Sequence, residues 1–448
     1  MKKLVFPHPL VLLLLCIIVA ALASYVVPAG QFDRTINEQT GREVVVPGSY
    51  HKVDASPVGF FQTLVAVPLG LERAASVVFL VFIVGGAFVV IDKTGALNSG
   101  MEYLVKRLES KEMLVIPISI LVFASLGALQ NFQEEIIPLV PILLILCRRL
   151  GFDNLTAAAI SIGAAMVGSS FSPMNPFQVG IAQKLADLPL LSGGGFRLIF
   201  LLIAIGVYMI IVWRRALKTR IAPERGGIEI VVGNQISTSQ RLILVILMLT
   251  FTFFVVGVIF WGWGFQEMSA AFLLSGIICG LIGGLKVRGT AEAFVSGFQE
   301  MAYAGILIGF ASGIFVVLEQ GLIIDSIVHN LFSSISSLPK ELSLTGITFI
   351  HTLIHFPVPS VSGHAVLTLP ILVPLSDLMG VSRQVTVLCY QYGAGMGEFL
   401  TPTNGALMAI LAAASVPFNQ WFKFALKVYG ALIALGLIAI YLAMYIGL

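Results

Sequence analysis

Long apolar runs dominate the pattern of hydrophobic and polar positions along the chain. A helix needs about 20 apolar residues to cross the hydrocarbon core of a bilayer. Runs of this kind predict membrane-spanning helices at 9–29, 74–92, 197–213, 242–262, 267–285, 300–318 and 425–447. Two amphipathic stretches, 94–111 and 320–338, are shorter than a span and are predicted to lie along the membrane interface.

Four longer apolar regions are interrupted by polar residues, Pro or Gly. The stretches 113–149 and 341–377 have a polar middle, and we expect each to form a re-entrant hairpin rather than two ordinary helices with a short turn. The stretches 155–186 and 384–416 are too long for one helix and contain Pro and Asn, which predicts two broken helices. Non-helical backbone at membrane depth is tolerated only inside protein or beside a water-filled cavity. The tips and the breaks are therefore predicted to surround a binding site.

The same order of residues occurs twice along the chain. Pro141-Ile142-Leu143 recurs as Pro370-Ile371-Leu372, and Ser172-Pro173-Met174-Asn175 recurs as Thr401-Pro402-Thr403-Asn404. Basic residues flank both ends of the first hairpin, whereas the ends of the second carry balanced charges. Because basic loops favour the cytoplasm, the two copies are predicted to face opposite ways, as in inverted-repeat transporters.

Lysine and arginine residues also predict the orientation and the organisation of the chain. Lys2 and Lys3 place the N-terminus in the cytoplasm, and the segment 31–57 suits the outside. An alternative is a signal peptide cleaved after Ala23, but we favour an uncleaved first helix because the apolar run continues to Val27. The predicted parts are the first span and first repeat at 1–217, a cytoplasmic linker at 218–241, and an extra span and second repeat at 242–448.

The composition restricts the class of protein further. Of the 448 residues, 58% are hydrophobic and 11% are charged. Soluble domains carry about 25% charged residues, so a soluble enzyme, a nucleic-acid binder and a disordered chain are excluded. The net charge of +3 is too small to indicate a polyanionic partner. Four cysteines inside apolar runs are expected to be free thiols: Cys16, Cys147, Cys279 and Cys389.

Three carboxylates fall at the predicted interruptions. Glu134 and Glu135 lie at the first tip, and Glu398 comes just before the second break. Carboxylates within a membrane are costly and mark functional sites, so they could bind a coupling cation, carry a proton or hold a substrate amine. The alternatives are a helix-capping role for Glu134 and Glu135 and a water-exposed helix end for Glu398. No Lys or Arg is close to an interruption in the sequence, which slightly favours a cationic or zwitterionic amino acid over a dicarboxylate.

Hydroxyls, amides and half-helix ends supply further candidate ligands. The predicted substrate-binding residues are Asn131, Glu134, Glu135, Asn175, Ser360, Ser362, Gly363, His364, Thr403 and Asn404. The predicted site of the coupling ion, Na⁺ or H⁺, consists of Ser172, Asn175, Glu398, Thr401 and Asn404. No other cofactor and no structural metal is expected.

The histidines allow one enzyme-class alternative. His351 and His355 are four residues apart and share a helix face, with His364 nearby, so a membrane-embedded metalloenzyme is a remote possibility. The sequence lacks the HExxH pattern and has no carboxylate between the two histidines. We therefore favour structural or proton-coupling roles, and we connect His364 with the substrate or a proton.

Several motifs resemble the C4-dicarboxylate anaerobic carrier family. They are Glu134-Glu135-Ile136-Ile137-Pro138, Asn175-Pro176-Phe177, Pro359-Ser360-Val361-Ser362-Gly363-His364-Ala365 and Thr401-Pro402-Thr403-Asn404-Gly405. The resemblance is strongest to the YfcC-type branch, whose members are described as basic amino acid antiporters, and it covers nearly the whole chain. It implies the ion transporter superfamily fold, with about nine spans, two re-entrant hairpins and two broken helices. It further implies a homodimer in the bacterial inner membrane, in which a transport part moves against a scaffold part as an elevator.

The residues and the resemblance together predict an ion-coupled secondary active transporter or exchanger. The expected substrate is a small carboxylate-bearing metabolite, with a basic amino acid favoured and a C4-dicarboxylate, coupled to sodium or protons, as the alternative. A channel would need a continuous pore, whereas paired hairpins and breaks indicate a closed site. The expected partners are the small-molecule substrate, the lipid bilayer and a second copy of the chain, with no nucleic acid.

Overall fold

The computed structural model describes residues 9–37, 42–97, 99–100, 103, 111–221, 236–261, 263–333 and 339–448. Within these ranges the regular elements are helices apart from four short strands, which confirms the predicted all-helical class. The strands form two antiparallel pairs, β1 (Gly30–Gln31) with β4 (His51–Lys52) and β2 (Arg34–Asn37) with β3 (Arg42–Val45).

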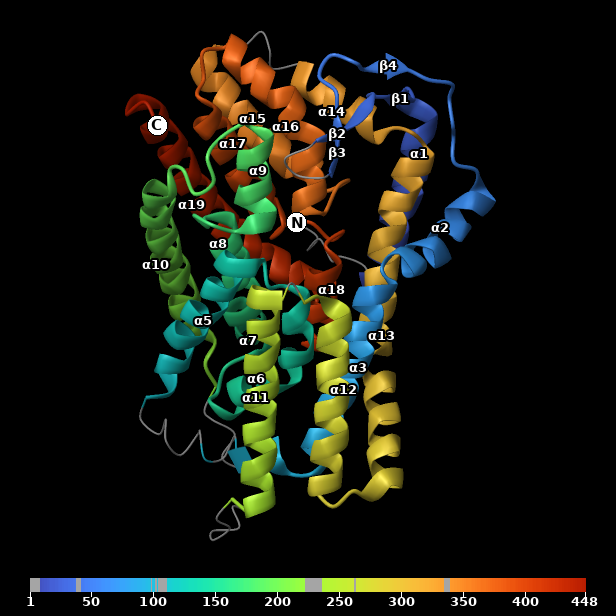
Figure 1. Ribbon diagram of the computed structural model, residues 1–448, viewed down its shortest axis with the longest axis vertical. Helices are drawn as coiled ribbons and strands as arrows, with labels where there is room; N and C mark the ends of the chain where they lie inside the picture. The colour runs from blue at the N-terminus through green and yellow to red at the C-terminus, as the bar shows by residue number, and fades with distance from the viewer. Residues whose placement is uncertain are drawn as a thin grey trace.

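The helices form two groups that pack against each other (Figure 1). The first, called the α13 group below, surrounds the longest helix. Its members are α1 (Pro9–Val26), α2 (Phe60–Arg73), α3 (Ala75–Lys93), α11 (Thr238–Trp261), α12 (Phe265–Ile282) and α13 (Lys286–Gln320). With 35 residues, α13 is about 50 Å long and runs along most of the molecule.

The second group, called the hairpin group, contains both predicted hairpins and both predicted broken helices. Its outer helices are α10 (Gly194–Thr219) and α19 (Phe418–Tyr445). The group meets the α13 group where α18 (Gly405–Ala413) packs on α13, with a smaller contact between α3 and the first hairpin. A short helix, α14 (Ile324–Ser333), connects the two groups in the chain.

The first predicted hairpin consists of a short 3-10 turn, η1 (Glu112–Leu114), then α5 (Val115–Gln130), the 3-10 segment η2 (Glu134–Leu139) and α6 (Val140–Arg149). Its two ends meet at one point, because Glu112 lies 3.6 Å from Arg220, and Ile221 N donates to the Gly151 carbonyl at 3.0 Å. The tip turns at Asn131, whose φ of 55° is left-handed and ends α5. The segment therefore runs out to a tip and back.

The second predicted hairpin consists of α15 (Lys340–Ile354) and α16 (Val361–Leu378). Lys340 Nζ donates to the Gly380 carbonyl, so the two ends of this segment also lie together. At its tip, Ser360 begins α16 by accepting a hydrogen bond from Gly363 N at 3.3 Å. Such a side-chain cap satisfies one of the free N–H groups at a helix start.

Both predicted broken helices are interrupted in the structure. The first consists of α7 (Asn154–Ala158), the π-turn η3 (Ala159–Gly163) and α8 (Ala164–Ser170), followed after the break by the π-turn η4 (Pro176–Gly180) and α9 (Ile181–Leu185). The second consists of α17 (Arg383–Gly397) and, after the break, α18. Asn175 and Asn404 cap the helical segments that follow the breaks by accepting backbone hydrogen bonds.

Glycines bring one arm of each hairpin into backbone contact with a broken helix. A Cβ atom at Gly168 of α8 would overlap the Ala124 carbonyl of α5, and one at Gly127 would overlap the Ala165 carbonyl. In the other half, a Cβ atom at Gly393 of α17 would overlap the Thr348 carbonyl of α15. Close-packed interiors resist added volume, so these positions require the absence of a side chain.

Helices long enough to cross a membrane coincide with most of the predicted spans. Among the described residues, six helices are long and apolar enough to cross a membrane, and four apolar helices are shorter. The shorter set includes Asn154–Ser170 and Val361–Asp377, which belong to a broken helix and a hairpin. Most of the predicted interfacial stretch 94–111 and the linker 218–241 falls outside the described residues, whereas α14 lies within the stretch 320–338.

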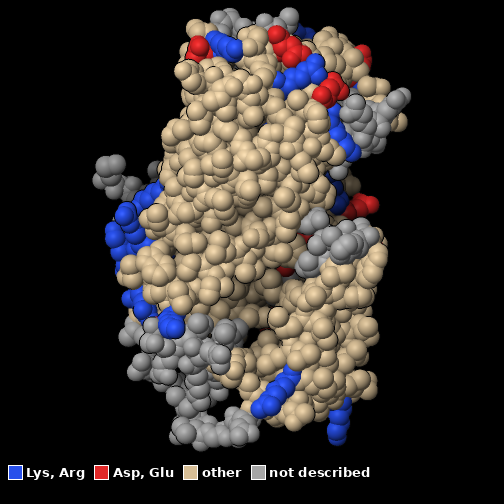
Figure 2. Space-filling model, turned by 60° about the vertical axis from the view of Figure 1, so that its left-hand side comes forward, with Lys and Arg blue, Asp and Glu red and all other residues tan. Residues whose placement is uncertain are grey.

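The surface fits a multi-pass membrane protein. Figure 2 shows a broad area without charged side chains over the middle of one face, bordered by Lys and Arg on its left, with acidic and basic side chains together at the upper end. Near that end, Asp325 of α14 holds the strand segment, because it pairs with Arg34 at 2.9 Å and accepts from Phe32 N at 3.0 Å. The four cysteines are free; three are buried and Cys16 is half-buried.

The glycine contacts give a first prediction. Gly168→Val should lower the melting temperature of the detergent-solubilised protein by about 5 °C or more, because the added side chain pushes α8 away from α5. Gly206→Val is the matched control, since no atom lies within 4 Å of the corresponding Cβ position in α10. Thermal unfolding followed by size-exclusion chromatography measures both. Equal melting temperatures for the two variants would contradict the proposed packing constraint.

Candidate functional site

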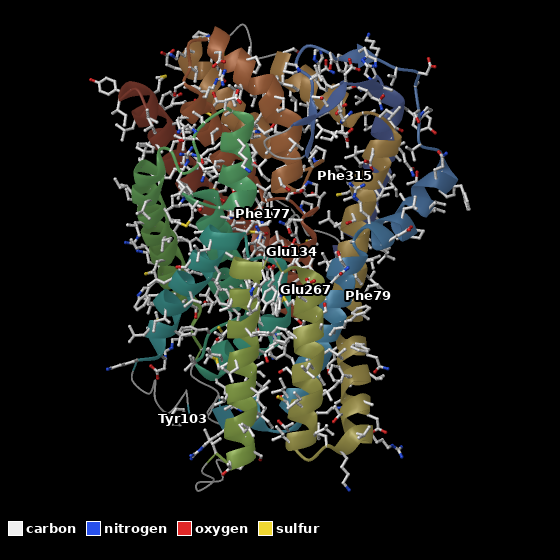
Figure 3. The ribbon with its side chains drawn as sticks, viewed as in Figure 1. Phe79, Tyr103, Glu134, Phe177, Glu267 and Phe315 are labelled. Atoms are coloured by element: carbon white, nitrogen blue, oxygen red, sulfur yellow. The ribbon has the colours of Figure 1, made fainter. Side chains whose placement is uncertain are left out.

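A cavity of about 490 Å³ lies where the two helix groups meet. Its volume is in the range of small-molecule binding sites. Glu134, Phe177 and Phe315, which all line it, lie near mid-height of the molecule in Figure 3. The polar lining side chains come from the first tip, the second tip, the second break, α13 and the end of α2: Asn131, Gln133, Glu134, Glu135, Ser360, Ser362, Glu398, Thr403, Asn404, Ser312 and Arg73.

Three carboxylates share this cavity. Glu134 and Glu135 begin η2 and are half-buried, and Glu398 follows α17 with 2% of its surface exposed. The burial of Glu398 contradicts the alternative that it is a water-exposed helix end. Glu135 accepts from Gln133 N at 3.1 Å, so it has the capping contact as well as its place in the cavity wall. Glu134 lines the cavity, and among the described residues its carboxylate accepts a hydrogen bond only from its own backbone N–H.

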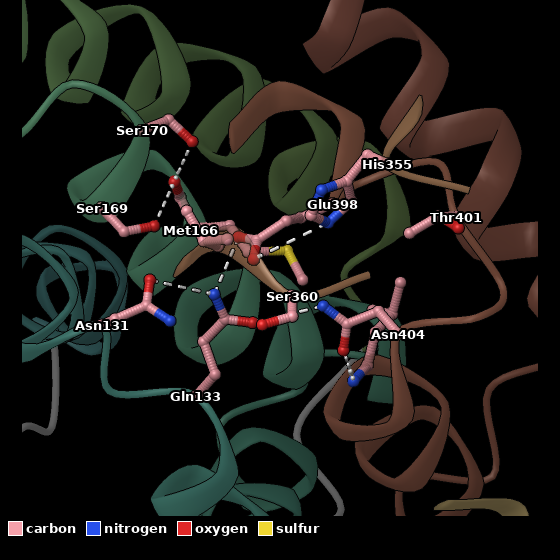
Figure 4. A network of polar contacts seen from close by, with 12 residues as sticks. Asn131, Gln133, Met166, Ser169, Ser170, His355, Ser360, Glu398, Thr401 and Asn404 are labelled. Atoms are coloured by element: carbon pink, nitrogen blue, oxygen red, sulfur yellow. Dashed lines mark hydrogen bonds and ion pairs between the residues drawn. The ribbon is translucent and has the colours of Figure 1, made fainter. Parts of the chain in front are cut away.

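Gln133 connects the first tip with the second break (Figure 4). Its Nε2 donates to Glu398 Oε2 at 2.8 Å, and its Oε1 accepts from Asn404 Nδ2 at 3.4 Å. His355 Nε2 lies 4.0 Å from Glu398 Oε1 on the other side. Sequence reasoning missed Gln133, although its position between Asn131 and Glu134 at a polar tip was a usable signal.

The second break supplies two of the predicted ligands to the cavity. Thr403 and Asn404 line it, and Asn404 Oδ1 also accepts from Leu407 N at 2.9 Å to cap α18. Thr403 Oγ1 donates to the Phe356 carbonyl at 2.8 Å and lies 2.7 Å from Thr401 Oγ1. Thr401 is buried behind Thr403 and does not line the cavity.

The first break lies apart from the cavity. Ser172 Oγ donates to the Ala128 carbonyl at 2.6 Å and accepts from Asn175 N at 2.8 Å. Asn175 Nδ2 donates to the Gly127 carbonyl at 2.9 Å, and its Oδ1 accepts from two backbone N–H groups of η4. Both side chains are fully buried and bonded to backbone. The structure therefore does not bring Ser172 or Asn175 to the cavity, and Phe177 is the lining residue after this break.

The predicted ligands at the second tip lie in different places. Ser360 and Ser362 line the cavity, whereas Gly363 lines a neighbouring one. His364 points into the protein: it is fully buried, and its Nε2 lies 2.9 Å from His351 Nδ1 in a hydrogen bond. His355 stacks on His364 with ring centroids 5.8 Å apart.

The three buried histidines, His351, His355 and His364, do not have the geometry of a metal site. Among the described residues, no group of three or more His, Cys, Asp or Glu side chains is arranged to hold a metal ion. Four of the buried ring nitrogens have no hydrogen-bond partner there: His351 Nε2, His355 Nδ1, His355 Nε2 and His364 Nδ1. The metalloenzyme alternative therefore lacks a ligand set in the described part of the chain.

Two arginines reach this region although no Lys or Arg is near an interruption in the sequence. Arg73, at the end of α2, lines the cavity and pairs with Glu319 at 2.7 Å. Arg197 of α10 is fully buried and donates to Gln391 at 3.0 Å, and Gln391 in turn donates to the Ser172 carbonyl at 2.8 Å. Sequence reasoning missed both residues because only the fold brings them close. The argument against a dicarboxylate thereby loses its premise.

A second cavity of about 500 Å³ adjoins the first. Arg73, Phe315 and Ser360 line both cavities and so form the wall between them. The second cavity lies beside the strands and includes Arg34, Glu43 and Asp325 in its wall.

The Gln133 connection gives a second prediction. Gln133→Leu should destabilise the protein by about 1–3 kcal/mol, because the buried Glu398 carboxylate loses its donor. A thiol-reactive dye can follow unfolding, since Cys147 and Cys389 are buried until the protein unfolds. Ser312→Ala is the control, because it removes a polar lining group with no hydrogen bond among the described residues. Equal unfolding temperatures for both variants would show that the Gln133 bonds contribute nothing.

Comparison with known proteins places the chain among carriers. It matches the profile described as "DcuC: C4-dicarboxylate anaerobic carrier" over residues 6–445. It is 30% identical to the "Putative basic amino acid antiporter YfcC" of Escherichia coli strain K12, an alignment that covers 100% of this chain and 98% of the relative. It is 29% identical to an uncharacterized protein of Haemophilus influenzae, covering 88% of this chain and 80% of that one.

Two solved transporter structures are similar to the chain at low sequence identity. The Alcanivorax borkumensis YdaH transporter is 15% identical with a TM-score of 0.42, covering 98% of this chain and 99% of that one. Neisseria gonorrhoeae MtrF, from a class of antimetabolite efflux pumps, is 16% identical with a TM-score of 0.42, covering 99% and 96%. On the match over nearly its whole length, the chain belongs to the C4-dicarboxylate anaerobic carrier family of membrane transporters.

Proposed function

We propose that the protein is an ion-coupled secondary transporter or exchanger of a small carboxylate-bearing metabolite, and that a basic amino acid is its substrate. The observation that carries this proposal is the convergence of Glu134, Glu135 and Glu398 on one cavity. Carboxylates that share a partly desolvated site repel one another, and a bound cation relieves that repulsion. The same cation can be the coupling ion, Na⁺ or H⁺, or the cationic group of the substrate.

The Escherichia coli relative supports the choice of substrate, because its name describes a basic amino acid antiporter. A basic amino acid carries a net positive charge together with a carboxylate. The cavity wall has the complementary excess of negative charge, with three carboxylates against one guanidinium, that of Arg73.

A C4-dicarboxylate is the second candidate, and Arg73 is the observation that favours it. A guanidinium binds carboxylates with paired, charge-assisted hydrogen bonds. The family description names C4-dicarboxylates as well. If a C4-dicarboxylate is the substrate, the glutamates hold the coupling cations, and these cations offset the negative charge of the substrate.

The arrangement of the two helix groups supports an elevator motion. The tips and the second break belong to the hairpin group, whereas Arg73, Ile308 and Phe315 belong to the α13 group, so the cavity lies at the boundary. We also propose that the two halves are inverted repeats. Matching contacts support this, since the corresponding residues Asn175 and Asn404 both accept backbone hydrogen bonds that cap the helical segment after their break.

We further propose that the protein acts as a homodimer in the bacterial inner membrane with its N-terminus in the cytoplasm. The turn between α12 and α13, with Lys286 and Arg288, lies at the lower end in Figure 1, opposite the strands. Basic residues at that end support a cytoplasmic placement for it. The relatives come from bacteria, which supports the choice of membrane.

Uptake into proteoliposomes tests the proposal. Labelled arginine should accumulate under an imposed sodium or proton gradient, and Glu134→Gln should reduce the uptake at least about ten-fold, because the substrate amine or coupling cation loses a charged partner. The measurement is initial uptake of labelled arginine and, separately, labelled succinate, with and without each gradient.

Glu292→Gln is the matched control, since Glu292 is an exposed carboxylate of α13 that pairs with Arg288. It should leave uptake unchanged. Gradient-driven succinate uptake without arginine uptake would replace the basic amino acid with the dicarboxylate. If neither compound accumulates under any gradient, the substrate class is wrong.

A further inference from the structure

Arg73 is the single Lys or Arg side chain among the described residues that line the cavity of the three glutamates. It ends α2, and one turn earlier Gly70 packs against the backbone of Gly309 and Gly313 in α13. A Cβ atom at Gly70 would overlap those backbone atoms, so the two helices touch at a fixed point. The backbone position of Arg73 is therefore set by a rigid helix contact.

The Arg73 guanidinium has N–H groups that make no hydrogen bond to the described residues. It carries N–H groups for five hydrogen bonds in a planar fork. Its Nη1 bonds Glu319 Oε2 at 2.7 Å, and no other hydrogen bond joins it to the described residues. Its Cζ lies 4.2 Å from the ring centroid of Phe315, which holds the plane of the fork.

The ion pair between Arg73 and Glu319 is weak, so a ligand carboxylate can bind Arg73 beside Glu319 or in its place. The side chains of Arg73 and Glu319 are 47% and 57% exposed. Ion pairs this exposed contribute about 0–1 kcal/mol to stability, because water solvates both groups well. A ligand carboxylate can therefore bind the remaining donors without a large cost.

The place of Arg73 between the two cavities gives it a selective role. Together with Phe315 and Ser360 it forms the wall between the cavity beside the strands and the cavity of the glutamates. A ligand that spans the cavity of the three glutamates meets the Arg73 guanidinium on the α13 group. On the hairpin group it meets the three carboxylates. Only a ligand with opposite charges at separate positions satisfies both.

We propose that Arg73 binds the carboxylate of the transported metabolite, while Glu134, Glu135 and Glu398 face its cationic group. The ligand class is a basic amino acid with a free α-carboxylate. This inference rests on the proposed function in taking the ligand to carry a carboxylate. Arg73 is then a specificity-determining residue, because it distinguishes the amino acid from the amine that remains when the carboxylate is lost.

Competition binding to the full-length protein in detergent measures this distinction. Labelled arginine is displaced by unlabelled arginine or by agmatine, which has the same guanidinium but no carboxylate. In the unaltered protein, agmatine should compete at least about ten-fold less well than arginine. Arg73→Gln should weaken arginine about ten-fold and leave agmatine unchanged, since only arginine loses a contact, and Arg73→Lys should fall between.

Two control variants separate ligand binding from structure. Glu319→Gln removes the ion pair and keeps the guanidinium, so the preference for arginine over agmatine should persist. Arg34→Gln changes an arginine that lines only the second cavity, and it too should retain the preference. Equal weakening of arginine and agmatine by Arg73→Gln would overturn the inference, as would a loss of the preference in Glu319→Gln.

Labelled succinate distinguishes failure of this inference from failure of the proposed function. If succinate binds, arginine does not, and Arg73→Gln abolishes succinate binding, then the substrate is wrong and the carboxylate-binding role of Arg73 stands. If arginine or succinate binds equally well with and without Arg73, the role of Arg73 is wrong and the proposed transport function stands. If neither compound binds to the unaltered protein, both fail.

Discussion

Helices that stop inside an apolar bundle must have their free backbone groups satisfied without bulk water, and the centre of this structure depends on that requirement. Asn175 caps the segment after the first break and donates to the Gly127 carbonyl of the first hairpin. Asn404 caps α18 and donates to Gln133 at the first tip. The side chains that satisfy the breaks thus also attach them to the hairpins. The cavity lies beside the second of these attachments, where Gln133 and Asn404 line it.

The fold could largely be predicted from the sequence, because long apolar runs and their interruptions determine where helices begin and end in a membrane. The run 9–29 contains α1, and the Pro and Asn residues near 172–176 do interrupt a helix. Which residues line the cavity was harder to predict from the sequence. Asn175 had the right chemistry but serves the backbone, whereas Arg73 had no local signal. Such differences arise from contacts between distant segments, which a linear pattern does not contain.

Charge is distributed unevenly around the centre of the molecule. The cavity has three carboxylates and one guanidinium, and that guanidinium is already paired with Glu319. Arg197, by contrast, is fully buried and bonded to the neutral oxygens of Gln391, Gln384 and Ser192. Arg197 organises these amides around it, whereas the Glu134 carboxylate lines the cavity and makes no ion pair with a described residue. The two charges therefore differ in their surroundings: Arg197 is enclosed by neutral oxygens, whereas Glu134 lies in the cavity wall.

The glycine contacts between hairpin arms and broken helices have a mechanical consequence. Where backbone touches backbone, as at Gly168 and Gly393, there are no long side chains that can swing aside and let the helices part. The arms α5 and α15 therefore cannot separate from their broken helices unless the backbone itself moves. The contact of α18 with α13 is of another kind, since a Cβ atom at Gly405 would meet Ile308 only at ordinary van der Waals distance. The boundary between α18 and α13, beside which the cavity lies, therefore lacks the interlocked backbone seen between α5 and α8 and between α15 and α17.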